Sequence, residues 1–99
     1  MLYAIVAEDV ESSIDKRKAA RPAHMNRMQQ LIADGRVGLA GPMPAIDSPD
    51  PGPAGFTGSL IVAEFESLQA ARAWIEADPY VTEGVFANIS VKPFVQVLP

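Results

Sequence analysis

The sequence contains no cysteine and only one histidine, His24. Without cysteine the chain can form neither a disulfide framework nor a thiolate metal site, and a single histidine argues against a histidine-rich metal centre. Basic residues are also few. Eight of them stand against twelve acidic residues, the net charge is −4, and they form no stripe that could follow a nucleic-acid backbone. We therefore expect neither a metal nor a nucleic-acid partner.

Long apolar runs are absent as well. No segment approaches the roughly 20 apolar residues that span a bilayer. The apolar opening, residues 1–7, is too short for a signal peptide and has no basic region before it. The 99 residues suit one domain, and 48% hydrophobic residues can bury a modest core. We expect one cytoplasmic domain over residues 1–99, without a membrane partner.

Four stretches have the composition of β-strands. Residues 2–8 and 58–65 are almost continuously apolar, which is typical of strands buried on both faces and therefore central in a sheet. Residues 36–41 form a third candidate. The fourth, residues 86–98, contains Pro93, which makes it an edge strand or interrupts it.

Two helices are expected between these strands. The first begins near Ser13 in what resembles a capping box and ends at Gly35. Pro22 either opens a second helical segment or kinks one long helix. The second helix follows Ser67 as N-cap and ends near Asp78. The residues expected on the buried faces are Met25, Met28, Leu31 and Ile32, then Leu68, Ala71, Trp74 and Ile75.

The segment of residues 42–57 holds five of the nine prolines and two glycines. This composition excludes a helix and an interior strand. A connection of this length is either a lid over a functional site or a surface excursion, and both interpretations remain open.

The resulting order is β-α-β-β-α-β, the ferredoxin-like arrangement of the α+β class. It predicts a four-stranded antiparallel sheet with residues 2–8 and 58–65 in the centre and both helices on one face. The other face would then be bare apolar surface, which seldom stays exposed on a monomer. We expect a second copy to cover it, giving a homodimer with the two open sheet faces together.

His24, Asp34 and Asp78 are the candidates for chemistry. His24 lies four residues before Met28, at the edge of the buried face of the first helix. The ordinary interpretation is that His24 is a hydrogen-bonded structural residue and that each aspartate belongs to the turn ending a helix.

Asp78, however, is expected in the last turn of a helix, where the helix dipole disfavours a carboxylate. It needs a donor or a cation beside it, and His24 is suitable if the two helices pack together. A His–carboxylate pair is the usual arrangement for proton transfer. Sequence spacing alone leaves open whether Asp78 or Asp34 is the partner.

Five short motifs resemble the YCII-related (YciI-like) family in order and spacing. They are Arg21-Pro22-Ala23-His24, Leu31…Gly35, Gly41-Pro42, Gly58-Ser59 and Ala77-Asp78-Pro79-Tyr80…Gly84. The resemblance covers nearly the whole chain and implies a single YCII-related domain of the dimeric α/β-barrel type. It also implies a His–Asp pair in a pocket between sheet and helices. On this sequence the pair is His24 and Asp78 as catalytic residues, with Arg21 and Ser59 as substrate-binding residues. Taken alone, Ser59 is an ordinary strand residue with an exposed hydroxyl.

One branch of the family is similar to a dehydrochlorinase of chlorinated hydroxyhydroquinones. Together with the absence of any phosphate loop, nucleophile elbow or metal motif, the resemblance implies a cofactor-free enzyme. It would move a proton on a small cyclic or phenolic substrate, as an isomerase or a dehydrochlorinase-like lyase. The alternatives are a non-catalytic small-molecule-binding or accessory module with the same pocket, and a purely structural role for the motif residues. The loop of residues 42–57 looks longer than the family's usual connection.

Overall fold

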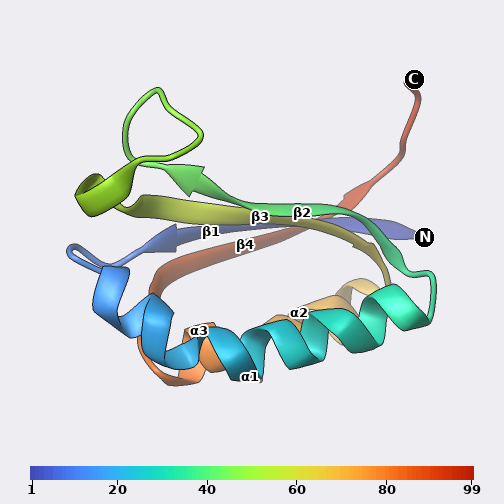
Figure 1. Cartoon of the computed structure of the whole chain (residues 1–99). Helices are drawn as coiled ribbons and strands as arrows, with labels where there is room; N and C mark the ends of the chain where they lie inside the picture. Colours follow the sequence, from blue (N-terminus) through green and yellow to red (C-terminus); the bar gives the residue numbers. More distant parts are fainter.

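The computed structural model of residues 1–99 has one antiparallel sheet with its helices packed against a single face (Figure 1). Its strands are β1 (Leu2–Asp9), β2 (Val37–Pro44), β3 (Phe56–Glu64) and β4 (Phe86–Phe94). Their spatial order is β2-β3-β1-β4, and every neighbouring pair is antiparallel. The ferredoxin-like fold and the central positions of β1 and β3 are therefore confirmed. Pro93 lies within β4, an edge strand, where a missing N–H is tolerated.

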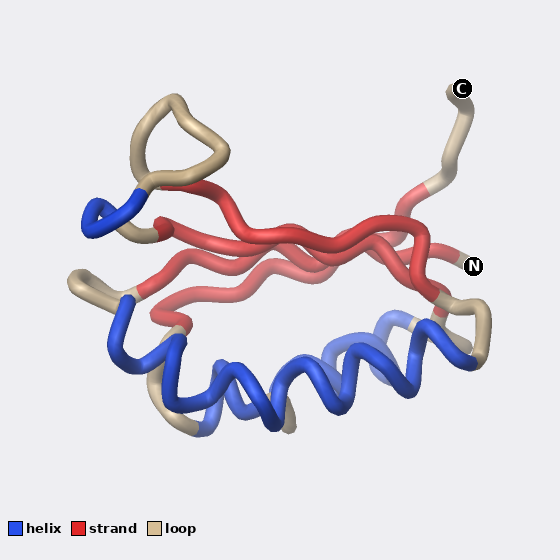
Figure 2. The backbone as a smooth tube through the Cα atoms, viewed as in Figure 1, coloured by secondary structure: helices blue, strands red, loops and turns tan.

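Helix α1 (Ile14–Ala33) runs without a break through Pro22 and ends just before Gly35, whose φ is +70°. Its path changes direction in its N-terminal half, the half that contains Pro22 (Figure 2). The expected capping box is wrong. Ser13 is the N-cap but makes no capping hydrogen bond with its side chain, because its hydroxyl donates to Asp9 Oδ2 at 2.6 Å.

Asp78 is not in the last turn of the second helix, as expected from the sequence. Helix α2 (Leu68–Glu76) ends earlier, and Asp78 is the N-cap of a separate short helix, α3 (Pro79–Thr82). Its extended ψ of 141° is the conformation favoured before proline, and Pro79 suits the first helical position. The carboxylate therefore lies at the end of a helix where the dipole favours it.

The proline-rich segment is more regular than expected, since β2 extends through Pro42 and Pro44 and a short 3₁₀ helix, η1 (Gly52–Ala54), follows. Proline fits there because β2 is an edge strand. The connecting loop rises on the side of the sheet away from the helices (Figure 1).

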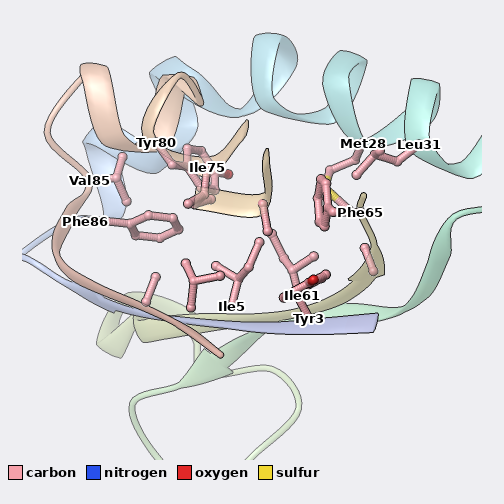
Figure 3. Close-up of a cluster of buried hydrophobic side chains, with 14 of the residues drawn as sticks. Tyr3, Ile5, Met28, Leu31, Ile61, Phe65, Ile75, Tyr80, Val85 and Phe86 are labelled. Carbon is pink, nitrogen blue, oxygen red and sulfur yellow. The ribbon is translucent and has the colours of Figure 1, made fainter. Parts of the chain in front are cut away.

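The core fills the layer between sheet and helices (Figure 3). Tyr3, Ile5 and Ala7 of β1 are buried there, whereas Val6, on the opposite face, is 40% exposed. In this single chain β1 is thus covered on one face only, not on both. No helix combines the length and apolar character needed to cross a membrane.

The expected helix stripes are correct in their centres and wrong at their edges. Met28, Leu31, Ala71 and Ile75 are buried, but Ile32 is 51% exposed and Leu68 42% exposed. Ile32 follows Met25 by two helical turns, so both lie on the flank of α1. That flank borders the cavity described next.

Candidate active site

A cavity of about 300 Å³ opens between α1, the β2–β3 side of the sheet and the start of α3. Two kinds of side chain border it. The polar ones are Arg17, Arg21, His24, Ser59 and Tyr80. The apolar ones are Met25, Met28, Ile32, Val37, Ala40, Pro42 and Ile61. Four of the sequence-derived candidates meet here, since Arg21, His24 and Ser59 line the cavity and Asp78 lies directly behind His24.

The Asp78 carboxylate is fully buried and has three donors around it. His24 Nδ1 lies 2.8 Å from Oδ1, the Tyr80 backbone N–H donates to the same oxygen at 2.9 Å, and Arg27 Nη1 donates to Oδ2 at 2.9 Å. Burial raises the pKa of Asp78, but the hydrogen bonds from His24 and Tyr80 and the charges of His24 and Arg27 outweigh it and hold the pKa below its ordinary value. Asp78 is therefore ionised at neutral pH.

An ionised Asp78 determines how the His24 ring is used. A carboxylate can only accept, so Nδ1 carries a proton and donates it to Asp78. In the neutral ring Nε2 is then the unprotonated nitrogen. Nε2 has no partner in the protein, and His24 borders the cavity. The imidazole is oriented by its buried nitrogen and keeps a basic nitrogen for a ligand.

Asp34, the alternative partner, lies outside this site. Its carboxylate is 63% exposed and its nearest cation is Arg36, at 3.9 Å. The turn interpretation of Asp34 agrees with its position as the C-cap of α1.

Tyr80 is a site residue that the sequence analysis did not single out. Its ring stacks on His24 with 4.0 Å between centroids and 9° between planes. Burial raises the pKa of Tyr80, although the charges of Arg17 and Arg21 oppose the rise, so the hydroxyl stays protonated. The sequence around Asp78 could have pointed to Tyr80. The side chain of an aspartate at an N-cap accepts from the backbone N–H of the second or third helical residue, and the second residue after Asp78 is Tyr80.

Arg17 was also missed. Its Nε and Nη2 donate to the two oxygens of Asp9 at 2.6 and 2.9 Å, and Nη2 also donates to the Gly58 carbonyl and to Ser59 Oγ at 2.8 and 2.9 Å. Ser59 is therefore 92% buried and its hydroxyl is engaged, contrary to the exposed hydroxyl expected from the strand pattern. Positions 17, 21 and 24 are spaced by four and three residues, which places them on one helix face.

Arg27, the third missed residue, lies one turn beyond His24. Besides its bond to Asp78, its guanidinium sits 4.6 Å from the centroid of the Trp74 ring. It holds the Asp78 oxygen that His24 leaves free. Nowhere do three or more His, Asp or Glu side chains group closely enough to hold a metal ion.

Comparison with known proteins places the chain in a family. The YCII-related domain matches residues 1–95. Protein YciI of Escherichia coli is 60% identical over 97 residues, which cover 98% of this chain and 99% of that protein. A Haemophilus influenzae protein is 50% identical over the same length, with the same coverage.

A solved structure extends the likeness to the fold. The 5-chloro-2-hydroxyhydroquinone dehydrochlorinase of Burkholderia phenoliruptrix, in complex with 2,5-dihydroxybenzoquinone, superposes with a TM-score of 0.84. It is 26% identical, and the match covers 96% of this chain and 94% of that chain. On the family match and on the two relatives, this chain belongs to the YCII-related family.

Proposed function

We propose that the chain is a cofactor-free acid–base enzyme that moves a proton on a small cyclic or phenolic substrate. The observation that carries the proposal is the 2.8 Å contact between His24 Nδ1 and Asp78 Oδ1 at the wall of a cavity. It leaves Nε2 as the proton acceptor and provides a fixed anion behind the ring. The likeness to a dehydrochlorinase supports the same class of chemistry.

In this mechanism Nε2 of neutral His24 takes a proton from the substrate, and ionised Asp78 stabilises the imidazolium that forms. In an isomerisation the proton returns to a different substrate atom. In an elimination the electron pair left by the proton forms a new double bond, and chloride departs with the electrons of the carbon–chlorine bond. General acid–base catalysis of this kind contributes about 10²–10⁴-fold to a rate. Arg21 and Ser59 are the proposed substrate-binding residues, Ser59 through its hold on Arg17.

The test uses 5-chloro-2-hydroxyhydroquinone as substrate and measures chloride release. Replacing the imidazole by an amide, His24→Gln, should lower the rate by about 10²–10⁴-fold, while Asp34→Asn, an exposed change outside the cavity, should leave it unaltered. Unchanged turnover in His24→Gln would remove His24 from the mechanism. Binding of the compound without any turnover by the wild type would favour the non-catalytic binding module.

We further propose that a second copy covers the open face of the sheet. Cross-strand neighbours point to the same side, and the pairs Val6–Leu60 and Leu39–Val62 place apolar side chains there. Val6 is 40% and Leu39 55% exposed in the single chain. Light scattering at micromolar concentration should give the mass of a dimer, and a monomer would contradict the proposal.

A further inference from the structure

The charges around the cavity are unbalanced in a way that the proton-transfer chemistry does not require. Three basic residues, Arg17, Arg21 and His24, border it, and no aspartate or glutamate does. This occurs in a chain whose net charge is −4. The two nearby carboxylates, Asp9 and Asp78, lie behind the basic residues with side chains only 1% and 0% exposed. The cavity therefore presents positive charge to whatever enters it.

Arg17 has donor capacity that the protein does not use. Its side chain is 90% buried, and Asp9, Gly58 and Ser59 occupy Nε and Nη2. A guanidinium has five N–H donors, and Nη1 has no acceptor in the protein. Every fully enclosed side-chain nitrogen of the structure has a hydrogen-bond partner. Nη1, which has none, is therefore not fully enclosed, and the cavity is the space that Arg17 borders.

Two further donors lie beside it. The Tyr80 hydroxyl has no hydrogen-bond partner in the protein. It is therefore not fully enclosed either, and Tyr80 borders the same cavity. The Arg17 guanidinium lies 5.2 Å from the centroid of the Tyr80 ring, and Arg21 borders the same cavity one helical turn after Arg17. Arg21 itself is exposed and forms no ion pair. The donors of one end of the cavity thus converge without an acceptor.

The other end of the cavity is apolar. Met25, Met28 and Ile32 of α1 face Val37 and Ile61 of the sheet across it. A ligand that satisfies both ends has a compact apolar body and one oxygen-bearing anionic edge, because bidentate guanidinium groups match planar oxyanions.

We propose that this cavity selects substrates bearing a delocalised oxyanion, a carboxylate or the enolate of a cyclic diketone, with Arg17 Nη1, Arg21 and the Tyr80 hydroxyl as its anion-binding groups. The inference rests on the proposed function, since it names the substrate class of the same cavity. The oxyanion lies against the arginines, the apolar ring extends toward Met28, and the reacting atom comes next to His24 Nε2.

The experiment compares ligands that differ in charge but hardly in shape. The probes are benzoate against benzamide, and the enolate of 5,5-dimethylcyclohexane-1,3-dione against its neutral methyl enol ether, titrated into the full-length protein by calorimetry. We expect each anion to bind at least tenfold more tightly than its neutral partner, because a charge-assisted contact replaces a neutral one. The affinity of the anions should fall as salt is added. The two pairs distinguish a carboxylate from an enolate as the preferred head group.

Arg21→Gln is the variant that tests the assignment, because Arg21 is exposed and makes no contact on which folding depends. It should remove most of the preference for the anion and leave benzamide binding unchanged. The matched control is Arg72→Gln, which removes an equal charge from α2, outside the cavity. A tenfold loss of anion affinity confined to Arg21→Gln supports the inference.

Equal affinity for anion and neutral probe, an anion preference that survives Arg21→Gln, or no binding of either probe at millimolar concentration would each overturn it. These outcomes are separate from those of the proposed function. An anion that binds through Arg21 but is never turned over refutes the enzyme and keeps the anion site. Turnover of neutral substrates that depends on His24 would refute the anion site and keep the enzyme.

Discussion

Asp78→Asn should destabilise the chain strongly and do so in a pH-dependent way. The carboxylate is completely buried and accepts from three donors, two of which belong to the basic side chains His24 and Arg27. The amide has nearly the same shape but only one accepting oxygen. It can keep the Tyr80 N–H and must turn its NH₂ group toward one of the basic side chains.

The magnitude follows from these contacts. A hydrogen bond to a charged group contributes about 1.5–3 kcal/mol, and a buried donor left unpaired costs a further amount. Arg27 can recover part of this loss, because its side chain is 24% exposed and can turn to water. We expect the free energy of unfolding to fall by roughly 2–3 kcal/mol at pH 7. For a domain of this size that lowers Tm by roughly 10–20 °C.

The pH dependence has a definite sign. The pKa of Asp78 is lowered from 3.8 on folding, so the ionised carboxylate stabilises the fold above pH 3.8 and loses this contribution as the pH falls through the folded-state pKa. The stability gap between wild type and Asp78→Asn should therefore narrow as the pH falls below 3.8.

Urea unfolding measures this gap. Trp74 fluorescence is a suitable signal, because the ring packs on Arg27 and Phe65 and both contacts are lost on unfolding. All variants are compared at one protein concentration, since association would shift the apparent stability. Asp34→Asn is the control, an exposed change expected to stay within about 0.5 kcal/mol. A gap that is absent at pH 7, or unchanged at pH 3, would refute the reasoning.

Three further predictions concern single positions. Gly58→Ala should unfold the chain or lower the free energy of unfolding by roughly 3 kcal/mol or more, because the added Cβ would lie 2.2 Å from a backbone oxygen of β1. In the control, Gly41→Ala, the added Cβ meets nothing within 4 Å, so this variant should be tolerated in the same thermal melt. Burial raises the pKa of Tyr80 above 10, so the folded state loses stability as the pH rises through that higher value. Tyr80→Phe should reduce this alkaline loss of stability in unfolding measured between roughly pH 9 and 11. An unchanged loss would contradict the raised pKa of Tyr80. Arg27→Gln removes the bond to Asp78 and should lower the free energy of unfolding by only about 1 kcal/mol in urea, since this bond is partly exposed. Arg27→Lys keeps the charge and should recover part of the loss. Equal losses in both variants would contradict a charge-dependent contact.

The order of strands and helices could be predicted because β1 and β3 are nearly continuous apolar runs, and because α2 and the second half of α1 carry apolar residues at helical spacing. Helix α3 could not, because four residues are too few to show a period, and Pro79 reads equally as the end of one helix or the start of another. Because of this ambiguity, the sequence prediction assigned Asp78 to the end of the second helix, whereas it is the N-cap of α3. Its contact with His24 survived the error, since the contact depends on α1 packing against residues 54 positions away rather than on the cap.

The remaining site residues were hidden for a similar reason. Arg17 reads as a solvated charge on a helix until Asp9 and Ser59 are placed beside it, and the latter is 42 positions away. Tyr80 reads as a core aromatic until its ring is found parallel to the imidazole. In each case the sequence supplies the residue type, and only the packing of α1 on the sheet and on α3 supplies the partner.

The two buried carboxylates have matching roles in this arrangement. Asp9, at the end of β1, holds Arg17, and Asp78, at the start of α3, holds His24. Each basic side chain is thereby fixed on α1 before a ligand arrives, with one nitrogen group left over, and such preorganisation reduces the entropy lost on binding. Arg21 lies between them on the same helix face and has no carboxylate of its own. It is the one cation of the cavity that is free to follow a ligand, so changing it should alter ligand selection at little cost to the fold.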